Sequence, residues 1–591
     1  MTGRRKMIKL PQFLKEVDAI AGKLSHEELE KILHEIARTW EENKREHFLQ
    51  LLKTYGSSTG EVREDDGYSD VRSGIKDIME CLTGINNSER CLNSEYNEEW
   101  DDWYNSDADE ILFSDPEGIL KDIGRAMELI HCCVDMELYK EGCELAETLA
   151  ILEVSSEGDY NDYDGSPLYL HDLDQYDLLM YDYEKFVKEC LYLIYMGNES
   201  EDRAEELFCM MGNFENYSIR LADIMQMGKD ELPEFDEFLT KWIAYLGQKK
   251  VKLAEDLLKE AQSFVQDDTV LLDNARKYAE EHPVLYKQLL EMNLESDKNE
   301  EMYQIGMEAL HKIPVSYTVR SDIALLTAVF AQKSQEKEKA ERCWVEAFRS
   351  DSTVVNYLRI RLLSGDWRAY QPEINAVIEK AYEAASQREN RNIYHEHFER
   401  ENYLHKNAYC TLLFFEGQFE KMHAVGMNEK EGLGWSTTFM KQGLALMMLL
   451  LYYGEELPAG LKSMQSIAYS ACGFNAEEYY KGTTETNMES GKVLFSKLYD
   501  SWKKKISLSE DEISLWIDRI EKWIELRVRG IMENNRRNYY GECAAFIAAF
   551  GEVRESLGKP NAKAAIMNQY RSEYARRSAF HRELRAYGMK K

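Results

Sequence analysis

One short pattern recurs along the middle of this 591-residue chain and restricts its fold more than any other feature. It consists of Ala-Glu, two variable residues and a larger side chain, at Ala204–Phe208, Ala254–Leu258 and Ala340–Trp344. A degraded copy runs from Met302 to Pro314. The copies continue on the same helical face, one turn further on, with Met211, Ala261 and Ala347. Residues three and four apart share a helix face, and alanine lets a neighbouring helix approach closely. The pattern therefore predicts the second helix of a repeated helical hairpin.

The spacing of the copies indicates an elongated stack of such hairpins. They begin at positions 204, 254, 302 and 340, an irregular period of roughly 40–50 residues that exceeds a strict tetratricopeptide. Nine prolines and long stretches without Pro or Gly favour helix throughout. We expect an all-α protein, a right-handed α-solenoid of tetratricopeptide-like helical hairpins with an N-terminal helical module and a C-terminal helical cap.

Local patterns divide the chain into five predicted regions. A capping box at Ser25–Glu28 and another at Ser509–Glu512 mark helix starts near the two ends. The prolines at 233, 283, 314 and 372 are predicted at helix boundaries. The predicted regions are an N-terminal helical module (1–56), an acidic linker or insert (57–110), a helical-repeat array (111–387), its continuation with a buried apolar helix (388–505), and a helical cap with a basic end (506–591).

The net charge of −35 narrows the classes of partner. This charge would repel nucleic acids and anionic membranes, which argues against a broad binding surface for either. The longest apolar run, Leu444–Tyr453, is far shorter than the ~20 residues that span a bilayer. The eleven scattered cysteines, with no secretory leader, indicate reduced core thiols. We expect a cytoplasmic protein without a membrane partner.

Three stretches carry a resemblance to a known family. They are Asp162-Tyr-Asp-Gly165, Leu433-Gly-Trp-Ser436 before a long apolar helix, and the end from Tyr539 to Leu584, which includes Tyr574-Ala-Arg-Arg577. Together they resemble bacterial tetratricopeptide-like helical-repeat proteins of the kind sometimes fused to a SWIM-type zinc finger. That finger needs Cys-x-Cys and Cys-x-His, and this chain has neither. The resemblance therefore implies the solenoid, without zinc or nucleic-acid binding by a finger.

Candidate metal ligands are few. His397, Glu401 and His405 are spaced four apart and would share a helix face, which fits either a metal site or a polar surface. His131-Cys132-Cys133 is a second cluster, with the thiols interpreted as core residues. Asp159–Gly165 looks like a calcium loop, but with Gly165 at position 6 the first and twelfth positions are Tyr160 and His171, which lack the required carboxylates. No cofactor or metal is expected.

Motifs of catalysis are also missing from the sequence. Gly432-Leu-Gly-Trp-Ser436 lacks the lysine of a phosphate loop, and His-Glu-x-x-His does not occur. Gly56-Ser-Ser-Thr-Gly60 matches Gly-x-Ser-x-Gly by spacing, but it begins a stretch interpreted as a linker and is not read as a nucleophile elbow. We therefore expect no enzyme. The predicted function is a non-catalytic cytosolic adaptor or scaffold that binds a protein or peptide partner on its helical-repeat surface.

Two kinds of residue are candidates for partner binding. Aromatic side chains lie in acidic stretches at Trp100, Trp103, Tyr160 and Tyr163, where they either contact a partner or anchor their own loops. Residues 561–591 carry eight Lys and Arg against two Glu. This basic end either caps the acidic body, binds a protein or binds nucleic acid, and its candidate contacts are Arg576, Arg577, Arg582 and Arg585. The alternative function is accordingly a nucleic-acid-associated protein, which would bind RNA or DNA with strong salt dependence.

The repeat pattern makes a direct prediction about stability. Ala254→Glu would place a charge in the hairpin seam and should lower the free energy of unfolding by several kcal/mol. Chemical denaturation followed by circular dichroism measures the change. A variant as stable as the parent protein would show that the alanines do not face the seam.

Overall fold

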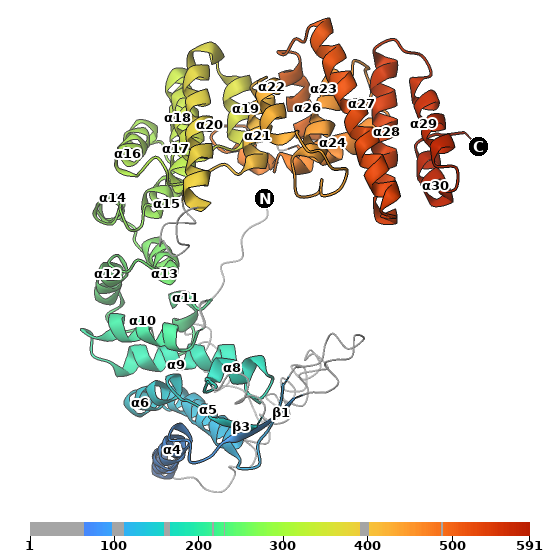
Figure 1. The fold of residues 1–591 in the computed structure, drawn as a ribbon. Coiled ribbons are helices and arrows are strands. Elements are labelled where there is room, and N and C mark those ends of the chain that lie inside the picture. Colours follow the sequence, from blue (N-terminus) through green and yellow to red (C-terminus); the bar gives the residue numbers. More distant parts are fainter. Residues whose placement is uncertain are drawn as a thin grey trace, which may run out of the picture. The chain divides into compact units, whose positions relative to one another are not determined.

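A computed structural model describes residues 64–96, 111–158, 166–215, 218–229, 231–389, 401–485 and 489–590 (Figure 1). The predicted N-terminal module at 1–56, including the capping box at Ser25, lies outside these residues. The chain divides into two compact units, Met1–Gln266 and Asp267–Lys591. Both are predominantly helical, which confirms the all-α expectation at this level. The division lies inside the region 111–387, and the predicted domain limits remain predictions.

The first unit combines helices with one small sheet. Its described elements are α4 (Glu64–Asn86), β1 (Leu92–Tyr96), β2 (Ile111–Ser114), α5 (Ile119–Asp135), α6 (Tyr139–Ala150), β3 (Ser156–Gly158), α8 (Leu170–Gln175), α9 (Tyr183–Gly197), α10 (Arg203–Asn213), α11 (Leu221–Ile224), α12 (Phe235–Leu246) and α13 (Lys252–Ser263).

The region expected to be an acidic linker contains ordered elements. Helix α4 buries an apolar stripe at helical spacing, made of Ile75, Ile78, Leu82 and Ile85. Strand β1 lies in the centre of the sheet, antiparallel to β2 and parallel to β3. Gly158, with a φ of 98°, brings β3 so close to Ser94 that a Cβ atom would overlap its carbonyl oxygen. The apolar stripe of α4 was not recognised in the sequence because the region 57–110 is acidic in overall composition.

The second unit contains helices and no described strand. Its elements are α14 (Asp268–Lys277), α15 (Val284–Met292), α16 (Asn299–Lys312), α17 (Val319–Lys333), α18 (Lys337–Ser350), α19 (Val354–Leu363), α20 (Trp367–Glu389), α21 (Lys406–Phe415), α22 (Phe419–Gly426), α23 (Met440–Leu451), α24 (Ala459–Ala471), α25 (Ala476–Tyr480), α26 (Gly491–Lys503), α27 (Glu510–Glu533), the short 3-10 helix η4 (Arg537–Tyr539), α28 (Tyr540–Ser556), α29 (Ala562–Glu573) and α30 (Ser578–Ala586).

The alanines of the recurring pattern are core residues. Ala204, Ala254, Ala309 and Ala340 are all buried, on α10, α13, α16 and α18 respectively. The positions two turns further on the same face, Met211, Ala261 and Ala347, are buried as well. The expected packing face is therefore present in both units.

A buried ion pair joins three consecutive helices of the second unit. Arg320 at the start of α17 donates to Glu346 on α18 at 2.7 Å, and to the carbonyl oxygen of Leu310 on α16 at 2.9 Å and 3.0 Å. It also reaches Ser350 Oγ at 2.9 Å. Burial raises the pKa of Glu346, but Arg320 and Arg349 outweigh this effect and hold it below the usual range. The hydrogen bonds compensate for burying the two charges.

The structure confirms some of the helix boundaries predicted from the sequence and contradicts one. The capping box of Ser509 and Glu512 opens α27, and the apolar run after Trp435 forms the buried helix α23, as expected. Pro283 is the N-cap of α15. The prediction for Pro372 was wrong, because this residue lies inside α20, near its start. A proline there removes a single backbone hydrogen bond of the helix.

The contact between α16 and α17 depends on a glycine. A Cβ atom at Gly306 would overlap the buried Thr327 side chain. Gly306→Ala should therefore lower the free energy of unfolding by about 1–3 kcal/mol. Gly541→Ala on α28 is the matched control, since its nearest neighbour would be at an ordinary 3.6 Å. Helix propensity alone makes the control neutral or stabilising. Equal stability of the two variants, measured by thermal melting, would contradict this packing.

Candidate functional site

Several predicted residues lie outside the described part of the chain. These are the aromatic candidates Trp100, Trp103, Tyr160 and Tyr163, the loop Asp159–Gly165, and the histidines at 395 and 397. Of the predicted metal trio, Glu401 pairs with Tyr317 in an isolated bridge and His405 is the N-cap of α21. Among the described residues, no group of three or more His, Cys, Asp or Glu side chains is arranged to hold a metal ion.

The His131 cluster forms a hydrogen-bonded pair in the first unit. His131 Nδ1 lies 2.7 Å from Oε1 of the buried Glu189, and Tyr181 donates to the other oxygen at 3.3 Å. The bond to Glu189 raises the pKa of His131 above its ordinary value. Cys133 is buried, and burial raises the pKa of its thiol to about 12, as expected for a core cysteine, whereas Cys132 is only partly buried.

The four predicted arginines separate into two kinds. Arg577 is structural, because it donates to the carbonyl of Met532 at 2.9 Å and to Asn535 Oδ1 at 2.5 Å, just after α27. Arg576, Arg582 and Arg585 are exposed. They lie on α30 and in the turn before it (Figure 1).

A second buried polar site in the second unit is formed around Arg359. This guanidinium, on α19, is fully buried and donates to the carbonyl oxygens of Tyr479, at 3.1 Å, and of Glu478. It also donates to Asn356 Oδ1 at 2.5 Å. Burial lowers its pKa to about 10, so it stays charged at neutral pH. Arg359 thus holds the chain at the end of α25, about 120 residues away.

The same chain segment is held a second time, at Gly482. Its carbonyl oxygen accepts from Trp344 Nε1 on α18 at 2.8 Å and from Gln332 Nε2 on α17 at 2.6 Å. Gly482 has a φ of 74° and lies directly against Leu325. We call residues 478–485 the clamped segment. Side chains from three successive helices hold it through its backbone carbonyl groups.

A groove of about 420 Å³ lies beside the clamped segment. Its floor is apolar, formed by Leu325, Leu326 and Val329 of α17 together with Leu294 after α15. Leu325 is buried, and the other three side chains are partly exposed. Tyr480 to Glu485 form the opposite wall. We call this site the α17 groove.

The rim of the α17 groove carries charges of both signs. Lys287 Nζ contacts Asp322 at 2.6 Å, and Lys481 Nζ contacts Glu478 at 2.6 Å and Asp322 at 3.6 Å. Lys333 donates to the carbonyl of Leu294. An apolar floor with a few polar groups at the edge is typical of binding sites.

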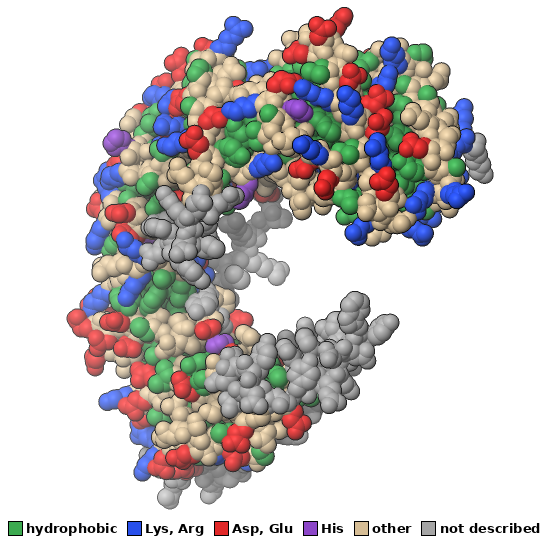
Figure 2. Space-filling model, viewed as in Figure 1, with side chains coloured by type: hydrophobic (Ala, Val, Ile, Leu, Met, Phe, Trp, Pro, Cys, Tyr) green, Lys and Arg blue, Asp and Glu red, His purple; other side chains and the backbone are tan. Residues whose placement is uncertain are grey.

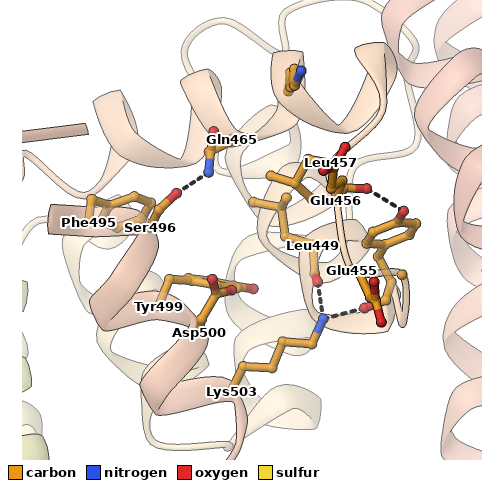
Figure 3. A pocket seen from close by; sticks show the side chains of 13 residues that line it. Leu449, Glu455, Glu456, Leu457, Gln465, Phe495, Ser496, Tyr499, Asp500 and Lys503 are labelled. Atoms are coloured by element: carbon orange, nitrogen blue, oxygen red, sulfur yellow. Dashed lines mark hydrogen bonds between the residues drawn. The ribbon is translucent and has the colours of Figure 1, made fainter. Parts of the chain in front are cut away.

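A second cavity, of about 370 Å³, lies between α23, α24 and α26 (Figure 3). Figure 3 shows Lys503 reaching the carbonyl oxygens of Leu449 and Tyr452 at the end of α23, and Gln465 bonded to Ser496. The Tyr452 hydroxyl donates to the Glu456 carbonyl at 2.6 Å. Many of the polar groups that line this cavity therefore satisfy one another. Lys503 has a structural role, since a cation stabilises the C-terminal end of a helix.

The groove residues were not predicted from the sequence. They come from segments about 150 residues apart, joined by the bond from Gln332 to Gly482. Leu326 and Val329 look like ordinary core positions in the sequence, because helical periodicity does not reveal which face remains uncovered. The only local indication was the run Gly482-Thr-Thr, which interrupts the helical pattern after α25.

Comparison of the chain with protein-family models, with curated proteins and with solved structures finds no match. In the described part of the chain, no helix combines the length and apolar character needed to cross a bilayer. Conclusions about function therefore depend on the geometry of the α17 groove and of the exposed surfaces.

The acidic groups near Arg359 predict a pH dependence of stability. Burial, reinforced by Asp322 and Glu478, raises the pKa of Asp351 to about 6. The pKa of Asp351 is higher in the folded state than in the unfolded chain. Its ionisation therefore lowers the free energy of unfolding as the pH rises from about 4 to about 6, and the full loss persists at higher pH. Asp351→Asn should therefore be more stable than the parent at pH 8, by about 1–2 kcal/mol after allowance for solvent screening.

Thermal melts of the parent protein and Asp351→Asn at pH 4 and pH 8 measure this effect. The difference between the two proteins should shrink at the lower pH, where Asp351 is protonated. A variant less stable than the parent at pH 8 would show that the Asp351 carboxylate stabilises the fold.

Proposed function

We propose that this protein is a non-catalytic scaffold that binds an extended peptide segment of a partner protein in the α17 groove. The proposal includes a cytoplasmic location and a right-handed solenoid of tetratricopeptide-like hairpins, in agreement with the resemblance found in the sequence. The observation that carries it is the open apolar floor of the groove beside a chain segment held through its backbone.

The clamped segment supports a peptide as the ligand. Arg359, Trp344 and Gln332 recognise carbonyl oxygens, which every polypeptide offers regardless of its sequence. A surface that holds the end of α25 and the turn after it by such bonds is suited to a second segment alongside it. Backbone bonds then supply affinity, while apolar pockets select side chains.

The composition of the groove also favours a peptide with mixed character. The leucine and valine side chains on the floor are partly exposed. A ligand that covers them would gain about 25 cal/mol of binding free energy for each Å² of apolar surface removed from water. The acidic and basic rim groups, exemplified by Asp322 and Lys481, are paired with each other, so the rim stays polar without favouring a ligand of one charge sign.

Selection of a peptide library displayed on phage against the full chain tests this proposal. We expect selected peptides to contain apolar side chains and to bind Val329→Glu at least tenfold more weakly than the parent, a loss of about 1.4 kcal/mol. The substitution places a carboxylate on the groove floor. Val493→Glu on α26, where the valine is 49% exposed, makes the same chemical change outside the groove and should leave binding unaltered.

Two results of the selection would contradict the proposal. One is the recovery of no peptide that binds the full chain. The other is equal affinity of the selected peptides for Val329→Glu and Val493→Glu. Circular dichroism of both variants establishes that any loss of affinity does not arise from unfolding.

A further inference from the structure

Charge is distributed very unevenly along the chain. Residues 64–266 contain 16 Lys and Arg against 50 Asp and Glu, a net charge of −34 that nearly equals that of the whole protein. Residues 527–591 contain 14 Lys and Arg against 6 Glu, a net charge of +8. The last helices of the second unit are therefore a positively charged region of a strongly acidic protein.

Several arginines earlier in the second unit are neutralised by carboxylates. Arg276 contacts Glu308 at 2.7 Å, Arg342 contacts Glu373 at 2.7 Å, and Arg519 contacts Glu420 at 2.7 Å. The exposed arginines of the last helices differ. Six of them are Arg529, Arg536, Arg537, Arg576, Arg582 and Arg585. Among the described residues, Arg582 contacts only its neighbour Glu583, at 3.5 Å, and no carboxylate lies within ion-pair distance of the other five.

These six residues, which we call the basic end surface, belong to two packed segments. The bonds of Arg577 to Met532 and Asn535 hold the turn before α30 against the C-terminal end of α27. Arg576 directly precedes Arg577 in the chain, and Arg536 and Arg537 directly follow Asn535. On α30, Phe580 and Leu584 are buried, and Arg582 and Arg585 are exposed, with the Arg582 side chain 75% accessible. Figure 2 shows Lys and Arg side chains gathered at this end of the second unit.

We propose that the basic end surface binds a short Asp- and Glu-rich segment of a partner protein. Although the protein has a large surplus of carboxylates, five of these six arginines have none of the described carboxylates within ion-pair distance, which leaves their donors available for an external anion. Arginine binds carboxylates through two parallel N–H donors, which gives such pairing geometric specificity. This surface is separate from the α17 groove, and the proposal does not depend on the groove.

The extent of the charge favours an acidic segment over nucleic acid or a second copy. Exposed charges interact over about 8–10 Å at physiological salt, so a short ligand confined to this surface experiences mainly its positive field. A nucleic acid would extend its phosphates beyond the surface. A second copy would bring its own charge of −35 towards an equally charged protein.

Fluorescence anisotropy with labelled oligoglutamate and the full chain tests the proposal. Binding should weaken with added salt and should fall at least tenfold in the double variant Arg576→Glu/Arg585→Glu. The control Arg368→Glu/Lys505→Glu reverses the same number of exposed positive charges at other places in the second unit and should bind like the parent. Arg576→Lys/Arg585→Lys keeps the charge but loses the paired N–H donors, so its affinity should lie between those of the parent and of the charge-reversal variant.

Three results would overturn the proposal. The first is equal oligoglutamate binding by the two charge-reversal variants. The second is tighter binding of a single-stranded RNA oligonucleotide than of oligoglutamate at about 0.15 M salt, which would indicate a nucleic-acid surface. The third is concentration-dependent self-association in analytical ultracentrifugation that Arg576→Glu/Arg585→Glu abolishes, which would identify a second copy as the ligand.

Discussion

The buried guanidinium of Arg359 is the interaction on which the α17 groove depends. Removing such an ion from water costs several kcal/mol, and three hydrogen bonds to two carbonyl groups and one amide offset that cost. The clamped segment is consequently fixed beside α17, and the space between them becomes a groove with two defined walls.

Similar polar contacts join other parts of the second unit. Arg320 joins α16, α17 and α18 through Glu346, and Arg527 on α27 joins Glu542 on α28 to the carbonyl of Gly432. The motif around Gly432 and Trp435 is therefore structural, since a Cβ atom at Gly432 would overlap the backbone of α27. Apolar packing supplies most of the stabilisation, and these directional bonds select one arrangement of the helices.

The two proposed binding surfaces use different physics. The α17 groove offers apolar area and rim charges that are already paired, so its affinity would depend weakly on salt. The basic end surface offers exposed arginines, five of which have no carboxylate within ion-pair distance among the described residues, so its affinity would depend strongly on salt. A scaffold with two such surfaces can hold two partners, or two parts of one partner, and salt distinguishes the two modes of binding.

The sequence by itself determined the helical class, the buried alanines such as Ala254, the capping box at Ser509 and the basic character of the C-terminal end. These features follow from the local period of apolar residues and from charge, which are properties of neighbouring residues. Only the tertiary structure decided that Arg359 is buried against Tyr479, that Val329 remains partly uncovered, and that Arg577 is structural whereas Arg576 is free of a described carboxylate. These facts depend on which distant segments pack together, and local periodicity carries no information about that choice.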